Sequence, residues 1–180
     1  MTAHLPASAP TIVLQTARLR IRHMTTSDAA FMLTMLNDAA WLRFIGDRGV
    51  RTLDEARRYI LDGPVAMVDR LGFGFHVVES KAGGCPIGVA GLARRDFLED
   101  VDIGYAFLPA HRGQGYAFEA ATAVLAHAEQ DLGLERIVAT VRAENASSIA
   151  LLHKLGLRFE RAIAHPDGTR DLQLFAIAFA

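Results

Sequence analysis

The stretch from Asp102 to Ala121, DIGYAFLPAHRGQGYAFEAA, constrains the fold more than any other part of the chain. Ile103 to Leu108 is apolar and aromatic enough for a buried strand. A turn with two glycines follows over Pro109 to Gly115, and the residues from Tyr116 to near Leu132 are rich in Ala and Leu, which favours a helix. The first amides of a helix have no internal acceptor, and glycines let an anion approach the backbone. The sequence therefore predicts an anion site at this turn.

Composition limits the classes of partner. The chain has 180 residues, of which 51% are apolar, and this suits one domain with a substantial core. Lys and Arg number 19 against 20 Asp and Glu, so the net charge of -1 gives no general basic field for nucleic acid. Cys85 is the only cysteine, which excludes an internal disulfide. The seven histidines have no metal-ligand spacing, so we expect no metal.

The chain reads as a single unit. No apolar run approaches the length of a membrane span, and the first residues do not resemble a signal peptide, so we expect a cytoplasmic protein without a membrane partner. Residues 1–15 are interpreted as an N-terminal arm, although residues 11–14 could add a short strand. Residues 16–180 form the predicted domain, without an internal repeat or a linker.

The predicted order of elements indicates a mixed sheet. Helices are expected after a cap at Ser27 or Asp28, and after a Thr52–Glu55 capping box that leads into a helix divided at Gly63-Pro64. Residues 40–50 are expected to form a loop. Strands are predicted near residues 19–21, 73–79, 85–93, 103–108, 136–141, 157–163 and 173–179, and further helices over residues 116–132 and 146–155. The predicted fold class is α/β (α+β), with a mostly antiparallel sheet of about seven strands and about four helices.

The turn also resembles a known family. The spacing Arg112-x-x-Gly115-x-Ala117 is similar to the pyrophosphate loop of the GNAT superfamily of acyl-CoA N-acyltransferases, and the order of elements matches over nearly the whole chain. The segment IGYAFLPAHRGQGYAFEA resembles the RimJ/RimL-type branch, as do TARLRIR near the start and DGTRDLQLFAI near the end. The resemblance implies that acetyl-CoA is the co-substrate. The residues it implies for binding coenzyme A are Phe107, Leu108, Arg112, Gly113, Gln114, Gly115, Tyr116, Ala117, Asn145 and Ser148.

A second stretch, from Asn145 to Phe159, resembles the same family. Structure alone explains Asn145 as a helix N-cap and Gly156 as a left-handed C-terminal residue. In the family the Asn contacts the pantetheine arm, and the position of Ser148 can lie near the thioester sulfur. Many members place a tyrosine on this helix as the general acid, but Leu152 stands at the matching position here. Ser148 is therefore the expected substitute, and a hydroxyl bonded to the backbone is the equally weighted alternative.

Three side chains are candidates for the general base. Asp102 begins the central strand, where some members of the family carry a Glu base, and it could equally be an exposed acid. Glu119 matches a glutamate of the RimJ/RimL-type sequence pattern, but the helix dipole also favours an acid in the first turn for structural reasons. His165 has a suitable pKa but lies in a predicted loop. We rank Asp102 and Glu119 ahead of His165.

The resemblance implies an N-acetyltransferase that acts by direct attack in a ternary complex. The acceptor would be a primary amine, either a protein N-terminal α-amine or a small molecule, bound near Trp41, Arg43, Phe44 and residues 94–97. A non-catalytic acyl-CoA-binding module and a purely structural protein are the alternatives, and a homodimer is left open. A dinucleotide site fits poorly, because Phe118 stands where G-x-G-x-x-G requires its third glycine.

Overall fold

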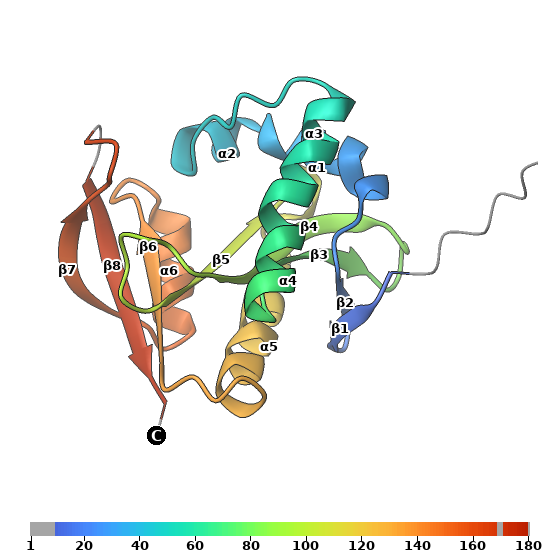
Figure 1. Cartoon of the computed structure of the whole chain (residues 1–180). Helices are drawn as coiled ribbons and strands as arrows, with labels where there is room; N and C mark the ends of the chain where they lie inside the picture. Colours follow the sequence, from blue (N-terminus) through green and yellow to red (C-terminus); the bar gives the residue numbers. More distant parts are fainter. Residues whose placement is uncertain (1–9, 169–170, 180) are drawn as a thin grey trace, which may run out of the picture.

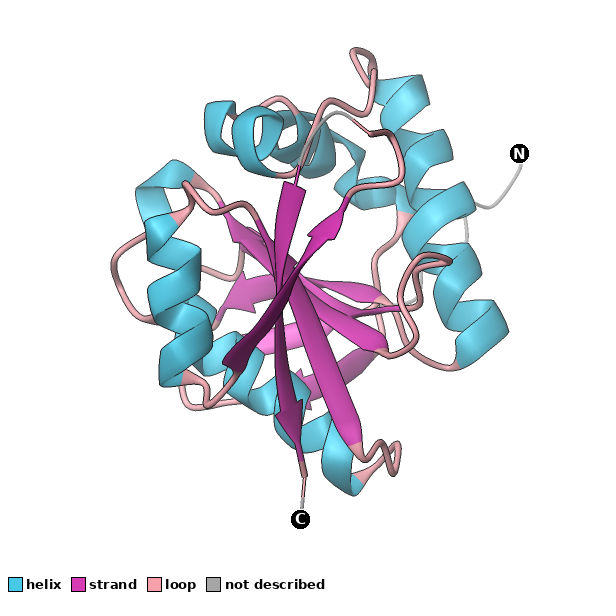
Figure 2. Cartoon of the chain, turned by 90° about the vertical axis from the view of Figure 1, so that its left-hand side faces the viewer, coloured by secondary structure: helices cyan, strands magenta, loops and turns pink. Residues whose placement is uncertain are grey.

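The computed structural model describes residues 10–168 and 171–179 and shows one twisted sheet with helices on both faces (Figures 1 and 2). The described strands follow the order β1-β2-β3-β4-β5-β6-β8-β7. Neighbouring strands are antiparallel except for β5 and β6, which are parallel. The strands are β1 (Ile12–Gln15), β2 (Leu19–Arg22), β3 (Phe75–Ser80), β4 (Pro86–Ala93), β5 (Val101–Phe107), β6 (Arg136–Val141), β7 (Arg158–Ala164) and β8 (Asp171–Ala178).

The helices complete two hydrophobic layers. They are α1 (Ala29–Leu36), α2 (Ala39–Phe44), α3 (Leu53–Ile60), α4 (Ala66–Leu71), α5 (Tyr116–Gln130) and α6 (Ala146–Lys154). Successive residues of a strand point to opposite faces. Val77 of β3 accordingly packs with the cluster formed by α1 and α3, while Val78 packs with the cluster that includes α5. In the described part of the chain, no helix has the length and apolar character needed to cross a membrane.

The sheet opens between β5 and β6. These strands pair only at Val101 with Ile137 and at Asp102 with Val138. Beyond that point the Asp102 Oδ1 atom accepts the backbone N–H of Thr140 at 3.2 Å, so a carboxylate replaces the next rung of the ladder. The edge of β5 that faces β6 has no strand partner from Ile103 onward in the described structure. This opening creates space in the middle of the sheet.

The fold class predicted from the sequence is confirmed, with local corrections. The predicted loop over residues 40–50 is wrong in its first part, because the Asp38 carboxylate caps α2 by accepting the amides of Ala40 and Trp41. Asp28 does not cap α1 with its side chain, since its oxygens bind Arg22 and the backbone N–H of Thr25.

Two further boundaries bear on the predicted strands and domain. Residues 1–9 of the predicted arm lie outside the described residues, and its end forms β1, which raises the strand count to eight. The predicted division at Gly63-Pro64 is a π-helical turn over Leu61–Val65, which joins α3 to α4. A proline has no N–H to donate, so the regular helical ladder is interrupted there.

Candidate active site

A pocket of about 910 Å³ lies where β5 and β6 diverge. Its lining comes from the strands β3, β4, β5, β6 and β8, from the loop between β4 and β5 and the turn after β5, from α5 and α6, and from the helical layer of α1 to α4. The pocket brings together most of the residues predicted from sequence, namely Asp102, Phe107, Arg112, Gly113, Gly115, Tyr116, Ala117, Asn145, Ser148 and His165. Leu108, Gln114 and Glu119 do not line it.

The turn before α5 presents a continuous row of backbone donors. Across the described part of the chain, the N–H groups of residues 113–118 have no intramolecular acceptor. Gly113 and Gly115 have φ of 72° and 80°, values that favour glycine, and Gly115 is the N-cap and so has no side chain to satisfy the helix amides. Free amides at a helix N-terminus, where the dipole is positive, suit a diphosphate. The residues present therefore fit the anionic part of coenzyme A.

Arg112 fixes this turn to the rest of the protein. Its Nε donates to the Phe107 carbonyl at 2.8 Å, and its Nη2 lies 2.5 Å from the Asp38 carboxylate. Arg18 holds the other side, because its Nη1 donates to the Gln114 carbonyl at 2.9 Å. The guanidinium of Arg112 is thus engaged within the protein, and the amides that follow it are left for a ligand.

Glu119 is held outside the pocket by the N-terminal hairpin. It accepts hydrogen bonds from the Thr16 hydroxyl at 2.5 Å, from the Arg18 N–H at 2.8 Å and from the Arg18 Nε at 2.6 Å. Desolvation is the largest influence on the pKa of Glu119 and would raise it, but these hydrogen bonds together lower the pKa below its ordinary value. Glu119 therefore connects the turn between β1 and β2 to α5.

Ser148 and Tyr105 form a hydroxyl pair in the pocket. The Asn145 side chain caps α6 by accepting the Ser148 N–H at 3.2 Å. The Ser148 Oγ lies 3.1 Å from the Tyr105 hydroxyl, and burial raises the pKa of Tyr105 to about 12 against the opposing effect of this bond. Leu152 is 1% exposed and belongs to the core. Sequence reasoning missed Tyr105, because only the approach of α6 to β5 shows that this strand residue meets Ser148.

Asp102 is buried at the opening of the sheet. It is 2% exposed, and its Oδ2 lies 2.5 Å from the Nε of Arg95. Burial raises the pKa of Asp102, and the guanidinium of Arg95 and the N–H of Thr140 oppose that rise. A carboxyl group with a raised pKa that lines a pocket is suited to proton transfer. The sequence named the region of Arg95 but gave no sign of this ion pair.

Most of the predicted acceptor residues also line the pocket. Trp41, Phe44, Arg94, Arg95 and Phe97 line it, whereas Arg43 does not and instead stacks on the Phe44 ring at 4.9 Å. His165 also lines the pocket, with its Nδ1 at 2.8 Å from the Asp167 carboxylate. The predicted acceptor residues that line the pocket are therefore aromatic or basic.

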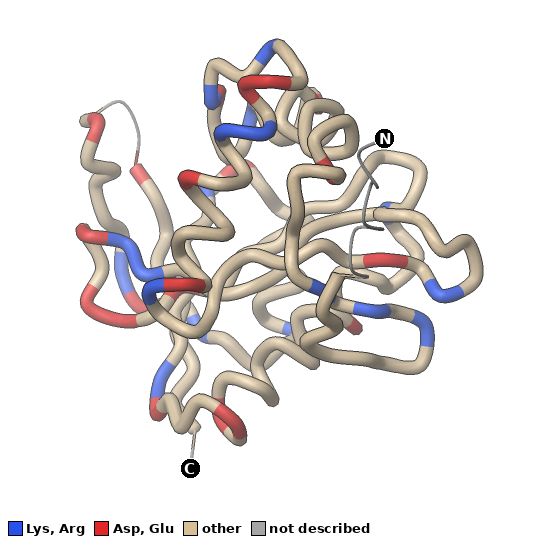
Figure 3. The backbone as a smooth tube through the Cα atoms, turned by 45° about the vertical axis from the view of Figure 1, so that its right-hand side comes forward, with Lys and Arg blue, Asp and Glu red and all other residues tan. Residues whose placement is uncertain are grey.

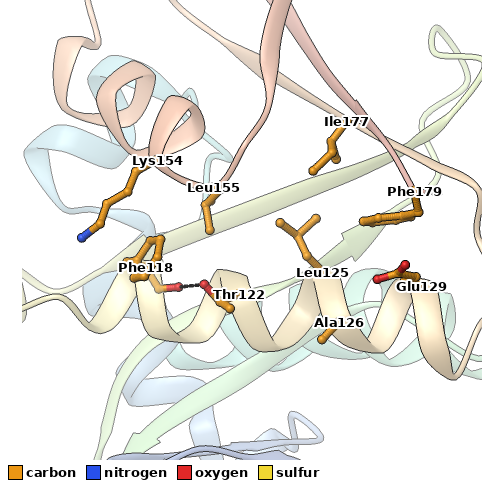
Figure 4. Close-up of a pocket in the computed structure, with 9 residues that line it drawn as sticks. All are labelled: Phe118, Thr122, Leu125, Ala126, Glu129, Lys154, Leu155, Ile177 and Phe179. Atoms are coloured by element: carbon orange, nitrogen blue, oxygen red, sulfur yellow. Dashed lines mark hydrogen bonds between the residues drawn. The ribbon is translucent and has the colours of Figure 1, made fainter.

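A smaller hollow of about 350 Å³ lies between α5, the end of α6 and β8 (Figure 4). Figure 4 shows Lys154 and Glu129 at opposite ends of a mainly apolar floor. The Lys154 ammonium lies over the Phe118 ring at 4.1 Å, and the Thr122 hydroxyl donates to the Phe118 carbonyl. This hollow offers no paired acid and base for catalysis, so the larger pocket is the candidate active site.

Comparison with known proteins agrees with this geometry. Residues 18–158 match the family model described as the acetyltransferase (GNAT) domain. The chain belongs to the GNAT family of acetyltransferases. The protein is therefore an acyltransferase, and the GNAT fold supports acetyl-CoA as its co-substrate.

Relatives and solved structures cover nearly the whole chain. An uncharacterized N-acetyltransferase of Bacillus subtilis, YoaA, is 28% identical over 92% of this chain and 96% of its own length. A GNAT-family acetyltransferase from Bacillus anthracis is 25% identical, with a TM-score of 0.76 over 91% of this chain and 96% of that one. RimL, a ribosomal L7/L12 α-N-protein acetyltransferase in complex with coenzyme A, is 20% identical, with a TM-score of 0.79 over 93% of this chain and 98% of that one. The last likeness shows the fold alone.

Proposed function

We propose that this GNAT protein transfers the acetyl group of acetyl-CoA to a primary amine by direct attack in a ternary complex. The observation that carries the proposal is the row of free amides over residues 113–118, beside an edge of β5 that has no strand partner from Ile103 onward. The amides would bind the diphosphate of coenzyme A. The amide-bearing pantetheine arm would pair with β5 as an added strand.

The hydroxyl pair of Ser148 and Tyr105 would serve the leaving thiolate. In the proposed reaction the amine nitrogen forms a bond to the thioester carbonyl carbon, the carbon–sulfur bond breaks, and the sulfur takes up a proton. Ser148 would donate a proton to the sulfur and regain one from solvent, while Tyr105 would donate a hydrogen bond to the Ser148 oxygen and keep its hydroxyl oriented. The developing oxyanion would be stabilised by a backbone amide near Phe107. Most of the rate enhancement would come from positioning, because the thioester is already activated.

Asp102 is the proposed acceptor of the proton that the amine loses. It lines the pocket, whereas Glu119 lies outside it and is bound to the N-terminal hairpin. Asp102 precedes Tyr105 on β5 by a rise of about 10 Å. An amine that attacks near Tyr105 would therefore pass its proton to Asp102 through water. His165, which also lines the pocket, is the alternative base.

The acceptor is proposed from the likeness to RimJ/RimL-type enzymes as a protein N-terminal α-amine or a small-molecule amine. A spermidine N-acetyltransferase chimera also shares the fold, with 20% identity and a TM-score of 0.73, so the fold accommodates different amines. Leu152 stands where many family members carry the tyrosine acid, so the proposed reaction depends on Ser148 in that role.

The test combines binding and turnover. Calorimetry should show one coenzyme A site, and a saturating ligand at one hundred times its dissociation constant should stabilise the fold by about 2.7 kcal/mol. Release of free thiol from acetyl-CoA should increase when a primary amine is added. A protein that binds coenzyme A but does not accelerate thiol release with any of the amines tested, from N-terminal peptides to polyamines, would refute transfer to a primary amine.

A further inference from the structure

The acidic side chains that line the large pocket are all paired within the described structure, whereas some of the arginines are not. Among the described residues, the only acidic side chains in the lining are Asp38 and Asp102, and each forms an ion pair with an arginine. Within residues 10–168 and 171–179, neither Arg48 nor Arg94 forms an ion pair or a hydrogen bond, although both line the pocket. Charged residues of both signs are spread over the chain (Figure 3), so the surface as a whole does not explain this local excess.

The two unpaired arginines lie away from the proposed diphosphate site. Arg94 follows Ala93, which pairs with Asp102 at the start of β5, whereas the turn with the free amides begins after Phe107. That length of strand corresponds to about 17 Å. Arg94 therefore lies at the opposite end of β5 from the phosphates that residues 113–118 would bind.

Arg48 approaches the same end from the helical layer. It lies in the loop between α2 and α3. Burial raises the pKa of the Tyr59 hydroxyl, and the positive charges of Arg48 and Arg95 oppose that rise. Tyr59 lines the pocket, so the loop of Arg48 and the loop of Arg95 converge there. A guanidinium group that lines a cavity without a counter-ion is suited to bind a carboxylate through two parallel hydrogen bonds.

Another part of the pocket wall is apolar. It is lined by methionines of the helical layer, with Trp41 and Phe44 beside them, and the methionines are Met24, Met32, Met35 and Met67. Flexible methionine side chains pack around apolar bodies of varied shape. An acceptor with a second positive charge would be repelled by these arginines, because both acidic side chains of the described lining are already paired.

We propose that the acceptor is a primary amine that carries an anionic group on an apolar body, and that Arg48 and Arg94 bind this group. The inference rests on the proposed function, because it names the acceptor class of that same site. Two sources supply the chemistry: the free carboxylate of a small amino acid, and an acidic side chain next to the N-terminal amine of a peptide. Both place an amine and an anion within one molecule.

The test measures binding to the protein saturated with coenzyme A, so that the result does not depend on turnover. Calorimetry would compare phenylalanine with phenylalaninamide, and the dipeptide amide Phe-Glu with Phe-Gln, with spermidine as the cationic probe. We expect the anionic member of at least one pair to bind about ten times more tightly than its neutral partner. The pair that shows the preference identifies the source.

Variants connect the preference to the two arginines. Replacing both, Arg48→Ala with Arg94→Ala, should abolish the difference within the pair, while Arg70→Ala on α4, an exposed arginine outside the pocket, should preserve it. Equal affinities within both pairs, or a preference that survives the double replacement, would overturn the inference. Failure of coenzyme A itself to bind would instead refute the proposed function. Coenzyme A binding with acetylation of neutral amines and no anion preference would refute the acceptor class alone.

Discussion

The two ends of the active-site pocket are built in different ways. The end proposed to bind the diphosphate consists of consecutive backbone amides over residues 113–118, held in place by Arg112 and Arg18. The end proposed to bind the acceptor consists of side chains from loops far apart in sequence, such as those of Arg48 and Arg94. A local backbone shape can be encoded by two glycines and a following helix, whereas a side-chain cluster requires the whole fold.

The two carboxylates considered as bases sharpen the same contrast. Asp102 is buried in the pocket and has a raised pKa, whereas Glu119 lies outside it, receives several hydrogen bonds and has a lowered pKa. Both lie next to a conspicuous motif in sequence. Their different environments come from elements distant in the chain, since Arg95 and Thr140 contact one and the β1–β2 turn contacts the other.

The largest effect is expected from Gly115→Glu. The new carboxylate would stand beside the free amides and repel the diphosphate, so the dissociation constant of coenzyme A should rise about 100-fold or more, as calorimetry would show. Gly133→Glu is the matched control, because Gly133 also has positive φ, 63° against 80° for Gly115, but lies after α5. Equal losses of affinity in both variants would place the phosphates elsewhere.

The second largest effect is expected from Asp102→Asn. Loss of a general base should lower kcat/KM about 100-fold. In the wild-type protein, the acidic limb of the pH–rate profile should lie above the pH at which an ordinary aspartate titrates, because burial raises this pKa. The limb should disappear in the variant. Asp100→Asn, which removes one of the two ion pairs of Arg136 in the same turn region, is the control. If the acidic limb of the pH–rate profile is unchanged in Asp102→Asn, another group is the base, and His165 is the first to test.

Ser148→Ala should lower kcat about 30-fold and change the affinity for acetyl-CoA by less than about threefold, since it removes an interaction made to the leaving sulfur. Tyr105→Phe should have a smaller effect. If Tyr105 acts through Ser148, the double variant should be no slower than Ser148→Ala alone. Steady-state kinetics of the single and double variants would decide this. Fully additive losses would show that Tyr105 acts independently of the serine.

The sequence predicted the elements whose signals are local. The Thr52–Glu55 capping box, the hairpin of β3 and β4, and the start of α5 at Tyr116 follow from residues a few positions apart. It did not predict α2, because residues 40–50 were expected to form a loop and the Asp38 carboxylate was not recognised as a helix cap. Within the site, the pairing of Tyr105 with Ser148 depends on tertiary contact over 43 positions, which no local pattern contains.

The smallest effect is expected from Glu119→Gln, which tests whether the second carboxylate has a structural role. Its kcat should stay within twofold of the wild type, while the free energy of unfolding should fall by about 1 kcal/mol through weaker bonds to Thr16 and Arg18. The folded-state pKa of Glu119 is lowered, so its contribution to stability is fully present above the ordinary glutamate pKa and is lost as the pH falls through the folded value. Urea unfolding of wild type and variant should therefore differ at neutral pH and converge in acid. Glu129→Gln, an exposed position on the same helix, should show no such difference, and a large loss of kcat in Glu119→Gln would restore that residue as a candidate base.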